Sequence, residues 1–273
     1  MSAQYDDKYN SSEAAMEDSS ASGPGKSPSR GVYWLPNLFT TGTLFGGFYA
    51  IVAAIDGNFS RAGIAIFLAM VFDGLDGRVA RWTNTQSDFG KEYDSLCDMV
   101  AFGVAPAIVV YQWGVERISD YGTFWGRFGW LAAFFYAVGA GLRLARFNAR
   151  AATADKRYFE GLPSPSAAAV VASFIWVVSE FPVTGLPGLA LAFSITLCAG
   201  ILMVSKFSYW SGKELNMRGR IPWVYAAVIP LIYVIISLAP VSLFTLFGLY
   251  AASAPLYWVW RKLNRKKRTP DPA

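Results

Sequence analysis

Long runs of apolar residues, separated by short polar segments, make up most of the chain after residue 34. A helix that crosses a bilayer needs about 20 mostly apolar residues. The stretches that approach this length are 35–55, 61–81, 95–114, 128–148, 165–181, 185–204, 221–239 and 241–260. The pattern predicts an all-α integral membrane protein with about eight transmembrane helices.

The two ends of the chain differ from this apolar pattern. Residues 1–30 are polar and rich in Ser, Ala, Gly and acidic side chains, so we expect a disordered tail there. Residues 31–260 hold all the predicted spans and form the expected membrane domain. Residues 261–273 begin with the sequence RKLNRKKR, which predicts a basic cytoplasmic tail against anionic headgroups or a simple anchor after the last span.

The composition supports the membrane interpretation and restricts the chemistry. Hydrophobic residues make up 54% of the chain and charged residues 16%, whereas soluble domains contain about 25% charged residues. Histidine is absent, which excludes every mechanism that needs a histidine base or metal ligand. Acid–base chemistry must therefore come from Asp, Glu, Lys, Tyr or Cys side chains.

The distribution of positive charge predicts the orientation. An even number of spans places both termini on the same side of the membrane. If that side is the cytoplasm, only Arg61, Arg117 and Arg127 of the 24 lysines and arginines lie outside. Cytoplasmic loops normally carry the excess of positive charge. We therefore expect a multi-pass protein of the inner membrane, with both termini and the acidic segment described next on the cytoplasmic side.

Four aspartates lie where the second predicted span ends and the third begins. Asp73 and Asp76 are three residues apart, and Asp94 and Asp98 are four apart, so each pair shares one helix face. A short loop joins the two spans, which are expected to be antiparallel neighbours. The four carboxylates can then meet near the cytoplasmic end, and ionisable residues in membrane helices usually mark a functional site.

Several carboxylates at one place need protonation or cations to offset their repulsion. A ligand set made only of oxygen atoms suits Mg²⁺ or Mn²⁺, and two such cations suit phosphoryl-type chemistry. Gly74 and Gly77 would let a phosphate approach the helix, and Arg81 could bind it. A helix-fixing ion-pair network is the alternative, but the nearby arginines could pair only two of the four acids. We expect Asp88 and Glu92 to be solvated loop residues.

The pattern Asp73-x2-Asp76-Gly77-x2-Ala80-Arg81-x8-Gly90-x3-Asp94-x3-Asp98 resembles the signature of the CDP-alcohol phosphatidyltransferase family at every fixed position. The segments LPNLFTTGTLFGGFYAI (35–51), GLRLARFN (141–148) and FEGLPSPSAAA (159–169) resemble the membrane-embedded branch of the family that uses serine. This resemblance implies transfer of a phosphatidyl group from CDP-diacylglycerol to L-serine, with release of CMP.

The resemblance also implies a set of site residues and a homodimer. Asp73, Asp76 and Asp94 would hold one divalent cation, Mg²⁺ or Mn²⁺. Asp73, Asp94 and Asp98 would hold a second, with Asp98 acting also as the general base. The residues expected to contact CDP-diacylglycerol are Asn37, Thr40, Gly77, Arg81 and Ser87.

The acceptor serine needs a partner for its carboxylate. Arg143 and Arg146 lie three residues apart at the end of the fourth predicted span, followed by Asn148, and one arginine could bind the carboxylate bidentately. The same arginines could instead only anchor the span on the cytoplasmic side. Ser164 and Ser166, between prolines, are either substrate contacts or loop residues.

Two other functions remain open at this point. The same chemistry could serve another acceptor, namely glycerol phosphate, inositol phosphate or choline. A transporter coupled to divalent cations or protons could also use the acids, although its ionisable residues would be expected near the bilayer midplane. No nucleic-acid partner is expected. Gly42-x3-Gly46 predicts close helix packing, either inside the chain or between two copies.

Overall fold

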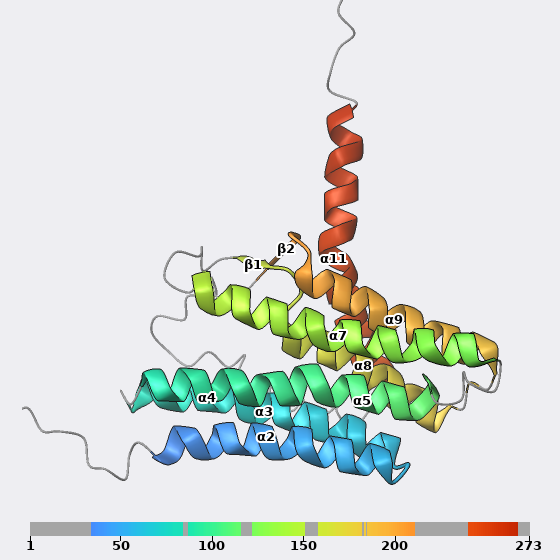
Figure 1. Ribbon diagram of the computed structural model, residues 1–273. Coiled ribbons are helices and arrows are strands. Elements are labelled where there is room, and N and C mark those ends of the chain that lie inside the picture. The colour runs from blue at the N-terminus through green and yellow to red at the C-terminus, as the bar shows by residue number, and fades with distance from the viewer. Residues whose placement is uncertain are drawn as a thin grey trace, which may run out of the picture.

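The computed structural model of the chain describes residues 34–83, 87–115, 122–150, 158–181, 183, 185–210 and 240–266. These residues are helical apart from one short antiparallel strand pair (Figure 1). The elements are α2 (Trp34–Ile55), α3 (Phe59–Trp82), α4 (Asp88–Asp98), η2 (Met99–Val104), α5 (Ala105–Val110), η3 (Tyr111–Val115), α7 (Thr123–Arg150), β1 (Tyr158–Glu160), α8 (Ser164–Glu180), α9 (Leu186–Val204), β2 (Ser208–Trp210) and α11 (Pro240–Lys266).

The all-α membrane class is confirmed in its coarse form. In the described part of the chain, Asn37–Ile55, Asp88–Gly114, Leu186–Val204 and Pro240–Asn264 are helical, long and apolar enough to cross a membrane. Every predicted span corresponds to a helix except 221–239, which lies outside the described residues, as does the predicted tail 1–30. The number of spans, eight, stays a prediction. Helices α3 and α7 carry charged residues and α8 has only 17 residues, so these three are not among the helices that are long and apolar enough to cross a membrane.

The acidic segment before the third predicted span is a helix, so the prediction of loop acids is wrong. The physical reason is an N-terminal cap: the Oγ of Ser87 accepts a hydrogen bond from the backbone N of Gly90, 3.0 Å away. Asp88 and Glu92 therefore lie on the first turns of α4. Both side chains are exposed, as expected, and Asp88 pairs with Lys91 at 3.1 Å.

Two more boundaries differ from the predicted ones. The segment around Ser164 and Ser166 is not a loop, because α8 begins at Ser164 and Pro163 precedes it as the N-cap residue. Proline is well tolerated in the first turn of a helix, where its missing N–H is not needed. At the other end of the chain, α11 continues to Lys266 and so runs past the predicted domain boundary at residue 260.

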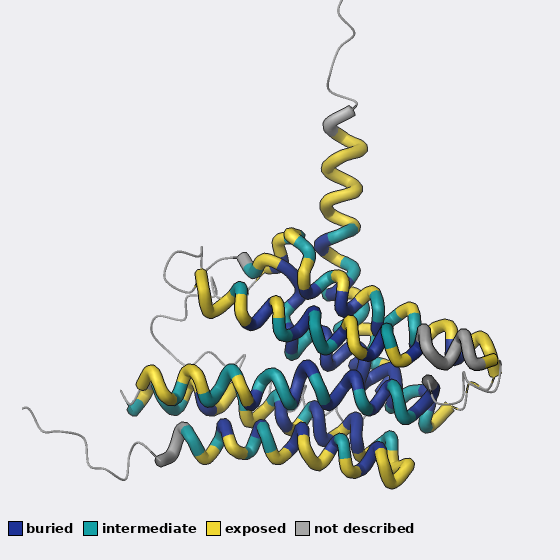
Figure 2. The backbone as a smooth tube through the Cα atoms, in the orientation of Figure 1, coloured by how far each residue is buried: buried dark blue, intermediate teal, exposed yellow. Residues whose placement is uncertain are grey.

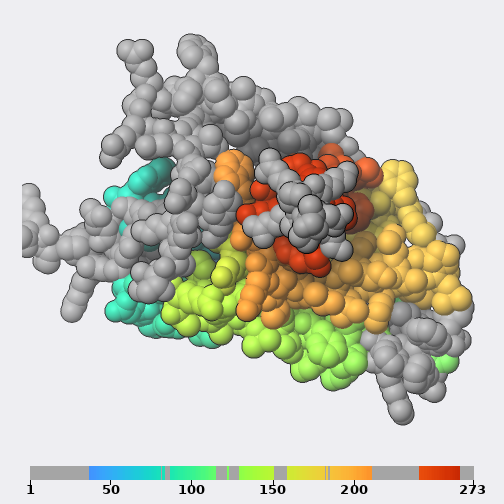
Figure 3. All heavy atoms as spheres, turned by 90° about the horizontal axis from the view of Figure 1, so that it is seen from above, coloured from blue at the N-terminus to red at the C-terminus, as the bar shows by residue number. Residues whose placement is uncertain are grey.

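The helices form two groups around the central helix α8. Figure 1 shows α2 and α3 beside the continuous helix formed by α4, η2, α5 and η3, while α7 and α9 lie side by side. Helix α8 contacts α3, α9 and α11 and is buried along most of its length. Figure 2 shows the buried positions where the helices face one another, and exposed residues along the C-terminal half of α11. Helix α11 crosses the direction of the others and is seen along its axis in Figure 3.

Small residues allow the helices to approach closely. A Cβ atom at Gly46 would lie 2.9 Å from the Cβ of Ala69, so the Gly42-x3-Gly46 face packs on α3 within the chain. On the neighbouring position of α2, a Cβ at Gly47 would lie 2.6 Å from the Cα of Ala101 in η2. At Gly46 and Gly47, α2 therefore approaches α3 and η2 too closely to leave room for a larger side chain.

Replacement of Gly47 by alanine is expected to destabilise the protein. The added Cβ would meet backbone atoms of Ala101, which cannot move aside as a flexible side chain can, and overpacking of this kind costs about 1–3 kcal/mol. Thermal unfolding in detergent should show a lower melting temperature. Gly248→Ala is the matched control, because a Cβ there meets no described atom within 4 Å and alanine favours the helix by about 1 kcal/mol. Equal melting temperatures for the two variants would contradict the close approach.

Candidate active site

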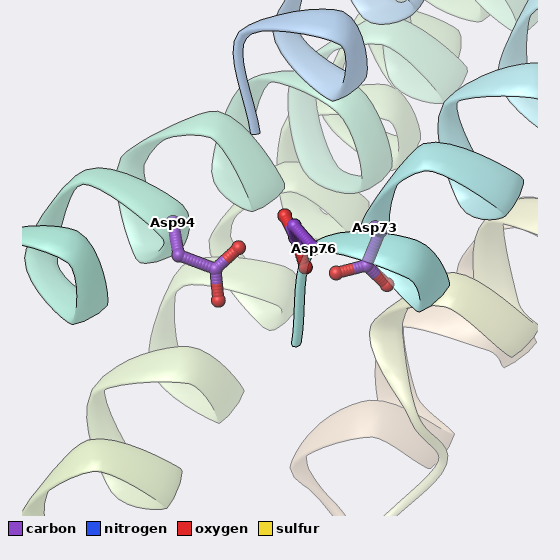
Figure 4. Close-up of side chains that lie close together, drawn as sticks. All are labelled: Asp73, Asp76 and Asp94. Carbon is purple, nitrogen blue, oxygen red and sulfur yellow. The ribbon is translucent and has the colours of Figure 1, made fainter. Parts of the chain in front are cut away.

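Three of the four predicted aspartates lie together. One carboxylate oxygen from each of Asp73, Asp76 and Asp94 lies within 4.8 Å of the other two. Figure 4 shows Asp73 and Asp76 on α3 and Asp94 reaching toward them from α4. Asp76 is buried and the other two are partly buried. The predicted convergence of acids from two antiparallel helices is therefore present in the structure.

Asp98 follows Asp94 by one helical turn and lies beside the same cluster. Its carboxylate interacts electrostatically with Asp73, Asp94 and Asp76, and with the guanidinium of Arg143. The Oδ1 atoms of Asp94 and Asp98 are buried and have no hydrogen-bond partner in the part of the chain that the structure describes. Buried acceptor oxygens without partners are unusual in folded proteins and point to a ligand.

The residues present fit a divalent cation. The cluster offers only carboxylate oxygens, which are the ligands that Mg²⁺ and Mn²⁺ prefer. One buried oxygen of Asp94 and one of the neighbouring Asp98 lack hydrogen-bond partners among the residues that the structure describes. The ion pairs found among the described residues, Lys91–Asp88 and Arg150–Glu160, involve none of the four acids. The alternative of a helix-fixing ion-pair network is not tested for Arg81, whose side chain lies outside the described residues.

Helix α2 supplies hydrogen bonds to both acidic helices. The Oγ1 of Thr40 donates to the Oδ2 of Asp76 over 3.0 Å, and both residues are buried. The Oγ1 of Thr41 lies 3.0 Å from the hydroxyl of Tyr93, the residue that precedes Asp94. The family resemblance implies a nucleotide contact for Thr40 and gives no role to Thr41, since contacts between residues 36 and 52 positions apart leave no signal in the local sequence.

The residues expected to contact CDP-diacylglycerol lie around the start of α4 and the end of α3. The Oδ1 of Asn37 and the Oγ of Ser87 lie 3.8 and 3.1 Å from the position that a Cβ on Gly90 would occupy, so α2 and α4 bring them to one place. A Cβ on Gly77 would meet nothing within 4 Å in the described part of the chain, so the described residues leave this position of α3 open. Arg81 belongs to α3, but its side chain lies outside the described part.

The expected acceptor residues differ in their surroundings. Arg143 is buried at 8% exposure, and its Nη1 donates to the Oγ of Ser164 over 2.7 Å. Its Nε has no hydrogen-bond partner among the described residues, and its charge interacts with Asp98 and Asp73. Arg143 thus places a buried, incompletely bonded cation beside the acidic cluster.

Arg146 and Asn148 donate to the protein itself. The guanidinium of Arg146 donates to the backbone carbonyls of Met203, Val204 and Ser205 at the end of α9, and to that of Glu160 in β1. These are carbonyl groups that a helix end leaves without intrahelical partners. The Nδ2 of Asn148 donates to the Oγ of Ser95 over 2.9 Å.

Comparison with known proteins agrees with the geometry. A model of the family described as CDP-alcohol phosphatidyltransferase matches residues 33–205. The chain is 32% identical to the CDP-diacylglycerol–serine O-phosphatidyltransferase of Helicobacter pylori strain 26695, over 85% of this chain and 94% of that protein. It is 39% identical to the enzyme of the same name from Saccharomyces cerevisiae, over 50% and 51% of the two chains.

An archaeal relative widens the comparison. The archaetidylserine synthase of Methanothermobacter thermautotrophicus is 35% identical over 64% of this chain and 69% of its own. The matched segment 33–205 contains all four clustered aspartates and the three residues of the expected acceptor site. The chain belongs to the CDP-alcohol phosphatidyltransferase family.

Proposed function

We propose that this chain is a CDP-diacylglycerol–serine O-phosphatidyltransferase, which transfers a phosphatidyl group to the hydroxyl of L-serine and releases CMP. The observation that carries the proposal is the cluster of Asp73, Asp76 and Asp94, with Asp98 beside it, in a chain similar to serine-using relatives along most of its length. The family in general uses divalent cations, and the cluster offers the ligands for them.

Two divalent cations, Mg²⁺ or Mn²⁺, would be held by Asp73, Asp76, Asp94 and Asp98. Bound there, they would neutralise the diphosphate of CDP-diacylglycerol and the charge that develops on the leaving CMP. The backbone at Gly77 is open to a phosphate group, and we assign contacts with the CDP moiety to Asn37, Gly77, Arg81 and Ser87. The role of Thr40 is treated below.

Asp98 is the proposed general base. The serine oxygen forms a bond to the β-phosphorus while the bond from that phosphorus to the CMP oxygen breaks, and the hydroxyl proton passes to the Asp98 carboxylate. The Oδ1 of Asp98, which has no hydrogen-bond partner within the described ranges, is an acceptor available for that proton. Binding both substrates in one site supplies a large part of the rate through orientation, and no covalent enzyme intermediate is required.

The serine carboxylate is assigned to Arg143. Of the three residues considered for this role, Arg143 has a buried donor atom, Nε, without a partner in the described structure, and it lies within electrostatic reach of the base Asp98. A guanidinium suits a carboxylate through parallel hydrogen bonds. Arg146 and Asn148 would support the pocket by fixing α7 against α9 and α4.

The proposed setting is the cytoplasmic face of the inner membrane. The excess of lysine and arginine on one side of the predicted topology supports this orientation, with both termini in the cytoplasm. The acyl chains of the lipid substrate would stay in the bilayer while its headgroup reaches the acids at the helix ends. A homodimer is proposed on the family resemblance.

Asp98→Asn is expected to slow the reaction strongly by removing the proton acceptor. In lipid micelles with CDP-diacylglycerol and Mn²⁺ or Mg²⁺, the unchanged protein should release CMP when serine is added and stop when EDTA is added. The variant should be slower by about 10²- to 10⁴-fold, the range of general-base contributions. Asp88→Asn is the matched control, since Asp88 is an exposed acid on the same helix and should leave the rate unchanged.

The acceptor series decides between the possible functions. Release of CMP with glycerol 3-phosphate, inositol phosphate or choline, but not with serine, would keep the chemistry and reject the serine assignment. A folded protein that binds Mn²⁺ yet releases no CMP with any acceptor would favour transport instead.

Arg143→Lys should weaken serine binding without affecting the lipid substrate. A hydrogen bond to a charged group is worth about 1.5–3 kcal/mol, so the KM for serine should rise about 10- to 100-fold while the KM for CDP-diacylglycerol stays constant. Serinol, which lacks the carboxylate, should react equally with the variant and the unchanged enzyme. Arg150→Lys, on the exposed end of the same helix, should leave both KM values unchanged. An unaltered serine KM in a folded Arg143→Lys protein would remove Arg143 from the acceptor site.

A further inference from the structure

Two neighbouring threonines on α2 connect this helix to the two helices that carry the acidic cluster. Thr40 bonds to Asp76 on α3, while Thr41 contacts Tyr93 on α4, next to Asp94. Helix α2 packs against both α3 and α4. One turn of α2 therefore contacts both α3 and α4, the two helices that carry the aspartates.

The hydrogen bond of Thr40 differs from those of other helical threonines in the described structure. The hydroxyls of Thr41, Thr43, Thr83, Thr196 and Thr245 donate to the backbone carbonyl four residues earlier in their own helix. Thr40 donates to a carboxylate 36 residues away, at 3.0 Å, with 4% of Thr40 and 5% of Asp76 exposed. A threonine has one hydroxyl proton, and toward a carboxylate it is the donor. This buried hydrogen bond joins α2 directly to one of the clustered acids.

The direction of the second contact follows from the same count of protons. Thr41 donates its proton to the carbonyl of Asn37, 2.7 Å away, so the hydroxyl of Tyr93 must be the donor in its contact with Thr41. The ring of Tyr93 also stacks on Phe89, with centroids 6.0 Å apart. Tyr93 is therefore held at both its ring and its hydroxyl, which fixes the turn of α4 that presents Asp94.

We infer that Thr40 and Thr41 are positioning residues, which set the spacing of the carboxylates on α3 and α4 before a divalent cation binds. This inference rests on the metal site of the proposed function. Without a cation, the like charges of Asp73, Asp76 and Asp94 repel one another, and the hydrogen bonds that join Thr40 to α3 and Thr41 to α4 oppose the resulting separation. Partners that orient metal ligands typically change metal affinity or activity 10- to 100-fold when they are removed.

The test measures binding of Mn²⁺ to the purified full-length protein, without substrate, from the electron paramagnetic resonance signal of the free ion. Thr40→Val has nearly the same shape as threonine but lacks the hydroxyl, and it should weaken Mn²⁺ binding about 10- to 100-fold. Thr40→Ser keeps the hydroxyl and should bind as the unchanged protein does. The Mn²⁺ concentration for half-maximal CMP release should shift in parallel.

Thr43→Val is the matched control. Thr43 lies one turn further along α2 and is fully buried, but its hydroxyl faces the carbonyls of Phe39 and Ala69 instead of a carboxylate. Its substitution should lower the melting temperature and leave Mn²⁺ binding unchanged. Equal weakening by Thr43→Val and Thr40→Val would assign the effect to general packing and overturn the inference.

Tyr93→Phe provides a second variant that removes one hydroxyl and keeps the ring contact with Phe89. It should also weaken Mn²⁺ binding, and it keeps the inference testable if Thr40→Val does not fold. Unchanged binding in the folded Thr40 and Tyr93 variants, in a protein that releases CMP with serine, would overturn the positioning role alone. Failure of the unchanged protein to bind Mn²⁺ would overturn both this role and the proposed metal site.

Discussion

The mutual repulsion of four carboxylates on two neighbouring helices is the constraint that the surrounding structure has to meet. Asp73 and Asp76 lie on one face of α3, and Asp94 and Asp98 on one face of α4. Their charges act on one another in a site where Asp76 is buried and the other three acids are partly buried. The neutral hydroxyl of Thr40 donates to Asp76, and the buried cation Arg143 interacts with Asp98 and Asp73. This compensation is partial, so the site keeps a preference for positive charge, which a divalent cation would satisfy.

In the proposed acceptor site, Arg143 and Arg146 lie three residues apart on α7 and have separate roles. Arg146 donates to carbonyls at the end of α9 and in β1, and so joins segments that are distant in the chain. The residues after β1 lead directly to Ser164, the first residue of α8, which accepts the hydrogen bond from Arg143. By holding these segments together, Arg146 keeps the hydroxyl of Ser164 in reach of Arg143. One arginine thus stabilises the frame in which the other bonds to Ser164 and keeps its Nε without a hydrogen-bond partner among the described residues.

The sequence predicts the features of the site that depend on local helix geometry. Spacings of three and four residues fix which carboxylates share a face, and a short connection makes α3 and α4 antiparallel neighbours. The start of α4 could also have been predicted, because Ser followed by acidic residues, as at Ser87, is a common helix N-terminus. The apolar pattern alone placed the start of this helix later, at residue 95. The hydrogen bonds of Thr40 to Asp76 and of Arg146 to α9 could not be predicted, since they join residues 36 to 59 positions apart through tertiary packing.

The helix that carries Asp94 and Asp98 directs these acids toward α3, and its next residues pack in the apolar core. A change from α-helical to π-helical winding after Asp98 allows both arrangements. The helix presents carboxylates to α3 as far as Asp98 and then becomes the π-helical segment η2, whose residues Ala101 and Phe102 are fully buried. A π-helical turn contains more residues than an α-helical turn, so it shifts the face on which later side chains lie. The hydroxyl of Tyr136 on α7 donates to the carbonyl of Phe102 over 3.0 Å and supports this irregular segment. Because the winding changes directly after Asp98, the acids can face α3 while the apolar residues that follow face the core.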